Sequence, residues 1–235
     1  MGEAIVLTEI EPSELSLDPI RADALILLQS EDSILHIEFQ TDPQKKIPFR
    51  MLDYRCRGHR RYPNKSMRQV VIYLKSTTSD LVYQTEFTLE RTRHEFDVIR
   101  LWEQPASLFL QYPGLLPFAT LSDTPDSEAM LRQVATAIDQ ISDPVLQANL
   151  SAASGILAGL RLEDTIIDLV LRRDIMEESS FYRSIVAEGA AKAKREIAIN
   201  LLQAGLTVTL IASSTGLSIE EVQILQQELS TASAA

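Results

Sequence analysis

The pattern of apolar and polar residues changes along the chain. In roughly the first hundred residues, short runs of alternating apolar and β-branched residues are separated by polar turns, which is typical of β-strands. The polar break at Ser30–Ser33 is short enough for a hairpin, so we expect the strands on either side of it to be adjacent and antiparallel. The runs that we expect to form strands are Ala4–Thr8, Ala22–Leu28, Ile34–Phe39, Val70–Lys75, Val82–Leu89 and Phe96–Leu101.

One helix is expected between the third and fourth of these strands, over Pro48–Tyr62. Pro48 suits the first turn of a helix, because the N–H that proline lacks would have no intrahelical partner there. A helix that joins two strands of one sheet is a crossover between them. The residues that recur at helical spacing, and that predict the buried face of this helix, are Phe49, Leu52, Cys56 and His59.

The second half of the chain follows a helical period. From about Asp126 onward, apolar residues recur every three to four positions, and Asp126 and Asp143 are placed as N-terminal caps. The run Pro113–Pro117 carries two prolines and a glycine, so we expect a hinge there between the strand-rich and helix-rich parts.

The C-terminal segment reads as a separate helical tail. Two short helices joined by the turn Thr215–Ser218 would form a helix-turn-helix, and Ser218 with Glu221 has the spacing of a capping box. The second of these helices has no Lys or Arg, so self-association of two chains is as good an interpretation of this tail as contact with DNA. We therefore expect a core at 1–121, a helical region at 122–184 and a helical tail at 185–235.

Composition indicates a globular protein and excludes a basic nucleic-acid coat. The chain is 45% hydrophobic and 23% charged, with a formal net charge of −11. The cations are nevertheless concentrated, because the window Lys45–Arg68 holds nine Lys and Arg residues and one acid, Asp53. A confined basic region on an acidic chain is typical of contact with a polyanion, although a solvated helix face paired with acidic neighbours has the same composition.

The expected helix also carries a polar stripe within this basic window. Guanidinium groups and a phenol on one helix face suit phosphate pairing and base stacking. Because the stripe lies on nearly the opposite side from the predicted apolar face, we expect it to point to solvent. The residues of this predicted DNA-binding stripe, spaced at i, i+4, i+7 and i+11, are Arg50, Tyr54, Arg57 and Arg61.

The candidate chemistry lies in the strand run that contains Glu38 and Gln40. Alternate residues of a strand point to the same face, so these two side chains emerge together. If Asp23 lies on the neighbouring strand, it and Glu38 would bind a divalent cation such as Mg²⁺, and Gln40 would orient a water molecule. The alternative interpretation is that Glu38 and Gln40 form the solvated face of a half-buried strand.

The histidines do not suggest a zinc site. His36, His59 and His94 are too scattered in the sequence to match the usual spacing of zinc ligands. His36 lies two residues before Glu38, so we expect it on the same face of the strand as a hydrogen-bonded structural residue.

The order of Asp23, then Glu38-Phe39-Gln40, then a basic helix with Arg50 and Tyr54, resembles the PD-(D/E)XK nuclease superfamily. Within it, the chain is most similar to the recombination-promoting nuclease (Rpn) and transposase-like family, in which Glu-x-Gln replaces Glu-x-Lys. The resemblance covers roughly Ala4–Leu121.

The resemblance implies an α/β fold with an αβββαβ core, a restriction-endonuclease-like mixed sheet, followed here by a helical C-terminal extension. It implies a DNA endonuclease that depends on Mg²⁺ or Mn²⁺ and acts in recombination or mobile-element biology. Asp23 and Glu38 match its metal ligands and Gln40 the position of its lysine, so these three are the expected catalytic residues. A further acid that such proteins draw from a preceding helix has three candidates here, Glu9, Glu11 and Glu14.

Two other interpretations stay open. The chain could be a catalytically inactive nuclease fold that binds nucleic acid or protein through its basic helix. It could also be an interaction protein whose function lies in the helical C-terminal half.

The sequence also predicts the compartment. A single cysteine, Cys56, cannot form an intramolecular disulfide, and residues Met1–Ile10 lack the basic start of a signal peptide. The longest apolar runs fall short of the roughly 20 residues that span a bilayer. We therefore expect a cytoplasmic protein with no membrane segment.

Overall fold

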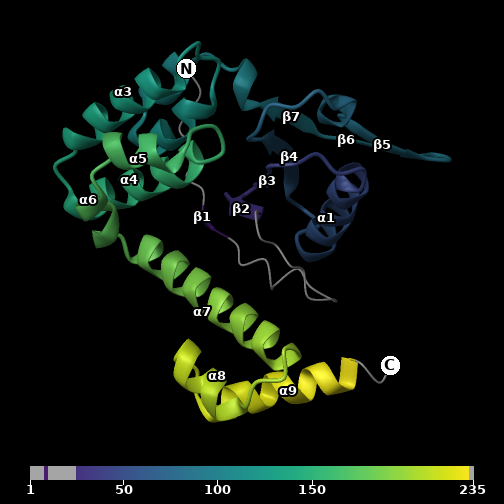
Figure 1. Ribbon diagram of the computed structural model, residues 1–235. Helices are drawn as coiled ribbons and strands as arrows, with labels where there is room; N and C mark the ends of the chain where they lie inside the picture. Colours follow the sequence, from purple (N-terminus) through teal and green to yellow (C-terminus); the bar gives the residue numbers. More distant parts are fainter. Residues whose placement is uncertain (1–7, 10–24, 233–235) are drawn as a thin grey trace. The chain divides into compact units, whose positions relative to one another are not determined.

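The computed structural model describes residues 8–9 and 25–232. These residues include a mixed sheet of five strands, whose arrangement can be followed in Figure 1. The protein belongs to the mixed α/β class that the sequence predicts. In spatial order the strands are β1 (Thr8–Glu9), β2 (Leu25–Gln29), β3 (Ser33–Gln40), β4 (Ser66–Tyr73) and β7 (Asp97–Arg100).

The strand pairings follow from the lengths of the connections. β2 and β3 are antiparallel and are joined by a tight turn, which confirms the predicted hairpin. β3 and β4 are parallel, and the helix α1 (Ile47–Arg61) connects them, which confirms the predicted crossover. The parallel register places Gln69 directly beside His36 and Val71 beside Glu38.

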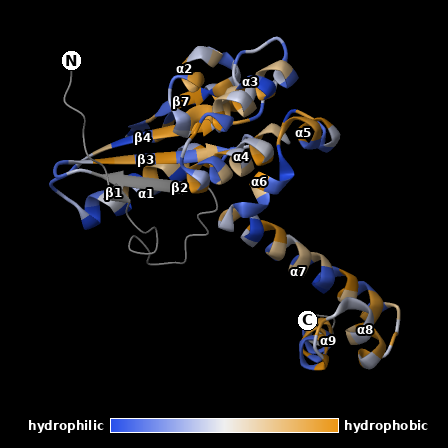
Figure 2. Ribbon diagram, turned by 90° about the vertical axis from the view of Figure 1, so that its left-hand side faces the viewer, coloured by the Kyte–Doolittle hydropathy of each residue, from blue (hydrophilic) through white to orange (hydrophobic). Residues whose placement is uncertain are grey.

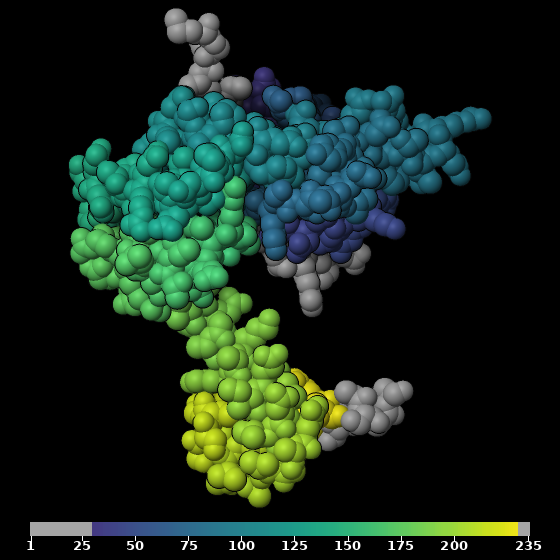
Figure 3. Space-filling view, turned by 45° about the horizontal axis from the view of Figure 1, so that its top comes forward, coloured from purple at the N-terminus to yellow at the C-terminus, as the bar shows by residue number. Residues whose placement is uncertain are grey.

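The run Val82–Leu89 does not form the single strand that was predicted. Its first two residues lie in a 3₁₀ helix, η2 (Asp80–Tyr83), which the Ser79 hydroxyl caps by accepting from Leu81 N. Its second half is β5 (Glu86–Leu89), which pairs with β6 (Thr92–Glu95) in a separate two-stranded sheet. This hairpin projects from its surroundings (Figures 1 and 3).

Different segments cover the two faces of the main sheet, whose central strands β3 and β4 are largely apolar (Figure 2). On one face lies α1, in a core whose buried members are Ile47, Met51, Val71, Tyr73, Val82 and Phe96. On the other face, Phe39 stacks on Phe118 with ring centroids 5.7 Å apart. Phe118 belongs to the 3₁₀ helix η4 (Pro113–Leu121), so the run predicted to be a hinge is a packed layer of the fold.

The buried face of α1 is not the predicted one. Phe49 is 55% exposed, and Cys56 and His59 are exposed as well. Gly58 lies on the buried face and approaches β4 closely, because a Cβ on Gly58 would lie 2.8 Å from Met67 Sδ. The residues that α1 buries are Ile47, Pro48, Met51, Tyr54 and Gly58.

From Ser127 onward the described chain is helical, as the sequence period predicts, and two short helices that were not predicted precede this part. Asp126 Oδ1 accepts from Ala129 N and Asp143 Oδ1 accepts from Val145 N, which confirms both predicted caps. The elements are η3 (Leu101–Glu103), α2 (Ala106–Leu110), α3 (Ser127–Asp139), α4 (Pro144–Ala158), α5 (Asp164–Val170), α6 (Arg173–Glu178), α7 (Ser180–Gln203), α8 (Val208–Thr215) and α9 (Ile219–Ala232).

The chain divides into two compact units. One comprises Met1–Ser142 with Ala153–Arg172, and the other comprises Asp143–Ala152 with Arg173–Ala235. These divisions do not fall at 121/122 and 184/185, where the three predicted segments meet.

The C-terminal unit contains the predicted pair of short helices. Gly216 ends α8 at a φ of 71°, in the left-handed region that favours glycine. Ser218 and Glu221 form the predicted capping box, since Glu221 N donates to Ser218 Oγ at 3.1 Å and Ser218 N donates to Glu221 Oε2 at 2.7 Å. Among the described helices, none combines the length and the apolar character needed to cross a membrane.

Candidate functional site between β3 and α1

Three polar side chains of β3 lie on its buried face. The strand alternates between partly and fully buried positions, and the fully buried set is Ile34, His36, Glu38 and Gln40. Glu38 and Gln40 therefore share a face, as predicted, and so does His36. With exposures of 3% for Glu38 and 8% for Gln40, the interpretation of a solvated strand face is wrong.

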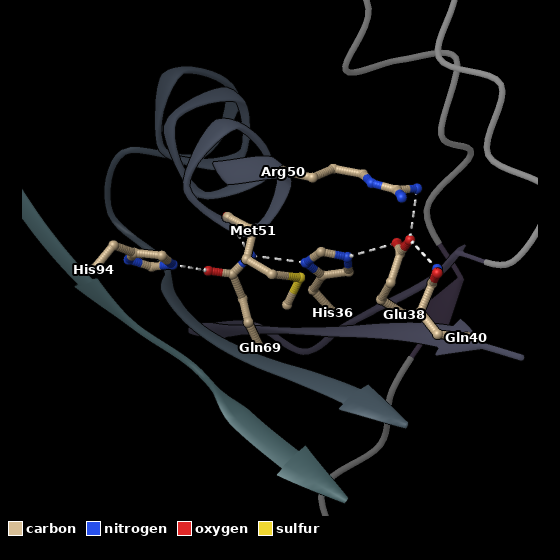
Figure 4. A network of polar contacts seen from close by, with 7 residues as sticks. All are labelled: His36, Glu38, Gln40, Arg50, Met51, Gln69 and His94. Carbon is tan, nitrogen blue, oxygen red and sulfur yellow. Dashed lines mark hydrogen bonds and ion pairs between the residues drawn. The ribbon is translucent and has the colours of Figure 1, made fainter. Parts of the chain in front are cut away.

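Two neighbours hold one oxygen of the Glu38 carboxylate (Figure 4). Gln40 Nε2 donates to Oε1 at 2.9 Å. Arg50 Nη1 lies 2.9 Å from the same oxygen, and its side chain is 27% exposed. The arginine thus reaches from the surface of α1 to a carboxylate that is itself buried.

The other oxygen of Glu38 faces a buried histidine. His36 Nε2 lies 3.7 Å from Oε2, and His36 is fully buried. Its second ring nitrogen, Nδ1, is 2.8 Å from Gln69 Nε2. The carboxylate is therefore the end of a polar network that extends into the core between α1 and the sheet.

The network continues through Gln69 to the hairpin. Gln69 Nε2 also donates to the carbonyl oxygen of Met51 in α1, at 2.8 Å. Gln69 Oε1 is 2.8 Å from His94 Nε2 on β6. Figure 4 shows these side chains in one row from His94 to Gln40.

Burial changes the acidity of the groups around this network. Burial, and next the negative charge of Glu38, raise the pKa of Tyr54 to about 12. The phenol therefore stays protonated at neutral pH, with its ring edge-on to His36 and the ring centroids 4.8 Å apart. Burial, and next the nearby Arg55 cation, lower the pKa of His94.

The predicted DNA-binding stripe of α1 does not point uniformly to solvent, so that part of the prediction is wrong. Tyr54 is 3% exposed and packs on His36, while Arg50 turns to Glu38. Arg57 pairs with Asp53 one turn earlier at 2.9 Å. Arg61 is exposed at the end of the helix. The stripe borders the buried face because Ile47 and Met51 belong to the core against the sheet, whereas Phe49 is exposed.

The predicted metal ligands are described only in part. Asp23 lies outside the described residues, as do Glu11 and Glu14, whereas Glu9 belongs to β1. Among the described side chains, no group of three or more His, Cys, Asp or Glu residues is arranged to hold a metal ion. Glu38 is thus the described member of the predicted pair.

Sequence reasoning missed Gln69 and His94 as members of this site. No local pattern marks them, because each lies on a different strand from Glu38 and is far from it in sequence. The parallel register of β3 and β4 is the signal that places Gln69 beside His36, and it required the pairing to be known.

Comparison with known proteins finds no relative of the chain. The chain matches no protein-family model, no curated protein and no solved structure.

Proposed function

We propose that this protein is a metal-dependent DNA endonuclease of the PD-(D/E)XK type. The observation that carries the proposal is that Gln40 and Arg50 both contact the same carboxylate oxygen of Glu38. Spacing along one strand accounts for Glu38 and Gln40, but Arg50 comes from a separate helix. Residues that share only a motif order in the sequence are therefore neighbours in space.

The order of elements supports the same proposal. Three strands, a helix and a fourth strand follow one another as β1, β2, β3, α1 and β4. The resemblance implies the same order for the βββαβ part of its αβββαβ core, so this order supports the proposal. The antiparallel β2–β3 pair and the parallel β3–β4 pair place the Glu38 end of β3 next to the start of β2.

The Glu38 carboxylate is the type of ligand that a hard divalent cation binds, although one of its two oxygens already has two partners. Mg²⁺ prefers carboxylate oxygens and retains several waters. Oε1 of Glu38 already interacts with Arg50 and Gln40, while Oε2 has the more distant His36. In the proposal Asp23 supplies the second carboxylate, and the pair would hold Mg²⁺ or Mn²⁺.

The residues of the chain divide the remaining tasks. A bound divalent cation lowers the pKa of a water ligand and offsets charge on a phosphate. The Gln40 amide orients a water or substrate oxygen by hydrogen bonding, since an amide does not accept a proton at neutral pH. Arg50 is partly exposed beside the carboxylate and can pair with a phosphate. Arg57 and Arg61 add positive charge that attracts the DNA backbone.

Cleavage of supercoiled plasmid in the presence of Mg²⁺ or Mn²⁺ tests the proposal. Glu38→Gln and Asp23→Asn should both abolish cleavage. Asp42→Asn is a matched control, because Asp42 is an exposed acid four residues after Glu38 and should cut at the wild-type rate. An inert wild-type protein, or Glu38→Gln cutting as well as wild type, would rule out the endonuclease.

The contact between Arg50 and Glu38 favours one second candidate, an inactive nuclease fold that binds DNA. In that case the arginine neutralises the buried carboxylate permanently. DNA binding would weaken with salt and would be unchanged by Asp23→Asn. Titrating MnCl₂ while recording the melting temperature separates the two functions, because a ligand of the folded state raises that temperature. A shift that Glu38→Gln removes supports the enzyme, and no shift supports the binding module.

A further inference from the structure

We infer that His36 is a positioning residue for the Glu38 carboxylate, and that Gln69 and the Met51 carbonyl fix its ring in the Nε2–H tautomer. The inference that this positioning serves cleavage rests on the proposed function. The tautomer itself rests only on the contacts of buried groups.

The carbonyl oxygen of Met51 fixes the orientation of the Gln69 amide. Met51 O lies 2.8 Å from one end of that amide, and a carbonyl oxygen can only accept a hydrogen bond. The end that faces Met51 must therefore be the NH₂ group. Turning the amide over would set two oxygens against each other in a buried position.

The orientation of the Gln69 amide determines which ring nitrogen of His36 carries the hydrogen. The same NH₂ group lies 2.8 Å from His36 Nδ1, so Nδ1 must accept and carries no hydrogen. A neutral imidazole has its one hydrogen on the other nitrogen. Nε2 is then an N–H donor. At the far end of the network, His94 donates from Nε2 to Gln69 Oε1, which the same amide orientation requires.

The Nε2–H group of His36 faces the Glu38 carboxylate. His36 Nε2 is buried and makes no hydrogen bond with the described residues. A buried N–H without an acceptor costs about 1–3 kcal/mol. The oxygen that it faces is Glu38 Oε2 at 3.7 Å. Moving the two atoms closer by about 0.7 Å would give a hydrogen bond of ordinary length.

Together these contacts restrain the carboxylate from both sides. Arg50 and Gln40 hold Oε1, and His36 faces Oε2. His36 cannot turn freely, because Gln69 holds Nδ1 and the Tyr54 ring lies edge-on to the imidazole. Residues that orient a metal ligand typically change metal affinity or activity by about 10- to 100-fold when they are replaced.

NMR of histidine labelled with ¹⁵N tests the tautomer in the full-length protein. The chain has three histidines, so His59→Gln and His94→Gln assign the signals by elimination. His36 should show a pyridine-like Nδ1 and a protonated Nε2. His59 is exposed and serves as the internal control, with averaged tautomers. A protonated Nδ1 at His36, or an averaged ring, would overturn the inference.

Two substitutions test the positioning through cleavage. His36→Phe keeps a planar ring beside Tyr54 but has no donor, and it should lower cleavage by about 10- to 100-fold. His36→Gln places an amide N–H near the position of Nε2 and should recover part of that loss. If His36 had only a structural role, both variants would lose activity only where their melting temperatures also fall. That result would overturn the positioning role.

The two proposals fail in distinguishable ways. If the wild-type protein cuts no DNA, the proposed function fails, and the tautomer measurement still tests His36 without any need for activity. If the wild type cuts DNA and His36→Phe cuts equally well, the endonuclease stands and the positioning role is wrong. Should His36→Phe not fold, His36→Gln and the spectrum of the wild type still decide the question.

Discussion

At the scale of single residues, Glu38 is a buried carboxylate with polar neighbours on both of its oxygens. A carboxylate that is 3% exposed is tolerated only when its charge is balanced and its oxygens have partners. Arg50 balances the charge, and Gln40 adds a neutral donor to the same oxygen. Of the two, the arginine should matter more, because hydrogen bonds from a charged group are the stronger ones.

Replacing Arg50 with methionine should therefore lower the free energy of unfolding by about 2 kcal/mol. This loss is smaller than the roughly 3–5 kcal/mol typical of breaking a fully buried ion pair, because Arg50 is partly exposed. Arg57→Met is the matched control on the same helix. Arg57 is 21% exposed, but its partner Asp53 is 40% exposed and therefore screened by water, so this pair should contribute only about 0–1 kcal/mol. Urea denaturation measures both without adding salt. Equal losses for the two variants would contradict a special role for the Glu38 contact.

The depressed pKa of His94 predicts a pH dependence of stability. The unfolded chain takes up a proton near the ordinary histidine pKa of 6.5, whereas the folded chain does so at a lower pH. Between those two values the unfolded state binds more protons, so stability should fall as the pH falls through this window and should level off below it.

His94→Gln tests this pH dependence, because a glutamine amide can still donate to Gln69 without titrating. The difference in free energy of unfolding between pH 7.5 and pH 5.5 should be smaller in this variant than in the wild type. His59→Gln, at an exposed position, should keep the wild-type difference. If His94→Gln and the wild type lose the same stability on acidification, the interpretation is wrong.

At the scale of elements, helix ends could be predicted locally but helix faces could not. The caps at Asp126 and Asp143 and the capping box at Ser218 depend on residues within a few positions of each other. The face that α1 buries depends on its packing in a core that includes residues of β4. The β5–β6 hairpin was missed for a different, local reason. Its turn contains Glu90 at a φ of 50° and lacks the Asn-Gly or Asp-Gly pair that marks such turns.

The cap of α3 gives a prediction at this scale. Asp126→Ala should lower the free energy of unfolding by about 1 kcal/mol, because the backbone N–H of Ala129 loses its acceptor. Asp123→Ala removes one exposed carboxylate nearby without removing a cap, so it should have little effect. Thermal unfolding followed by circular dichroism measures both. A loss in Asp123→Ala as large as that in Asp126→Ala would assign the effect to net charge.

At the scale of the whole molecule, each compact unit has a hydrophobic core of its own. The first unit contains the core between α1 and the sheet. The second contains a smaller core whose buried members are Ala198, Ile211, Val222 and Leu225. Separate cores allow the units to open separately.

Ile211→Ala should therefore destabilise the C-terminal unit selectively. Removing this fully buried side chain should cost about 2–5 kcal/mol. In hydrogen exchange, protection of the α8 and α9 amides should fall while that of β3 and β4 is unchanged. Ile224→Ala makes the same change at a position that is 54% exposed, and it should have little effect. Equal loss of protection in β3 would show that the two units unfold together.

The sequence by itself determined the local features of this protein. Alternation in β3 placed His36, Glu38 and Gln40 on one face, and helical periodicity located α1 and the helices after Asp126. A short turn determined the antiparallel β2–β3 pair, and the helix between β3 and β4 indicated the crossover. Each of these depends on backbone geometry within one element or across one turn.

Only the tertiary structure decided what surrounds Glu38. Which face α1 buries, whether Arg50 points to solvent or to a carboxylate, and whether Gln69 and His94 reach His36 all depend on contacts between separate elements. Apolar periodicity predicted a face of α1 that the structure leaves largely exposed, and packing against the sheet selects the face that is buried. Such contacts arise from packing between segments that are distant in sequence, so no local pattern records them.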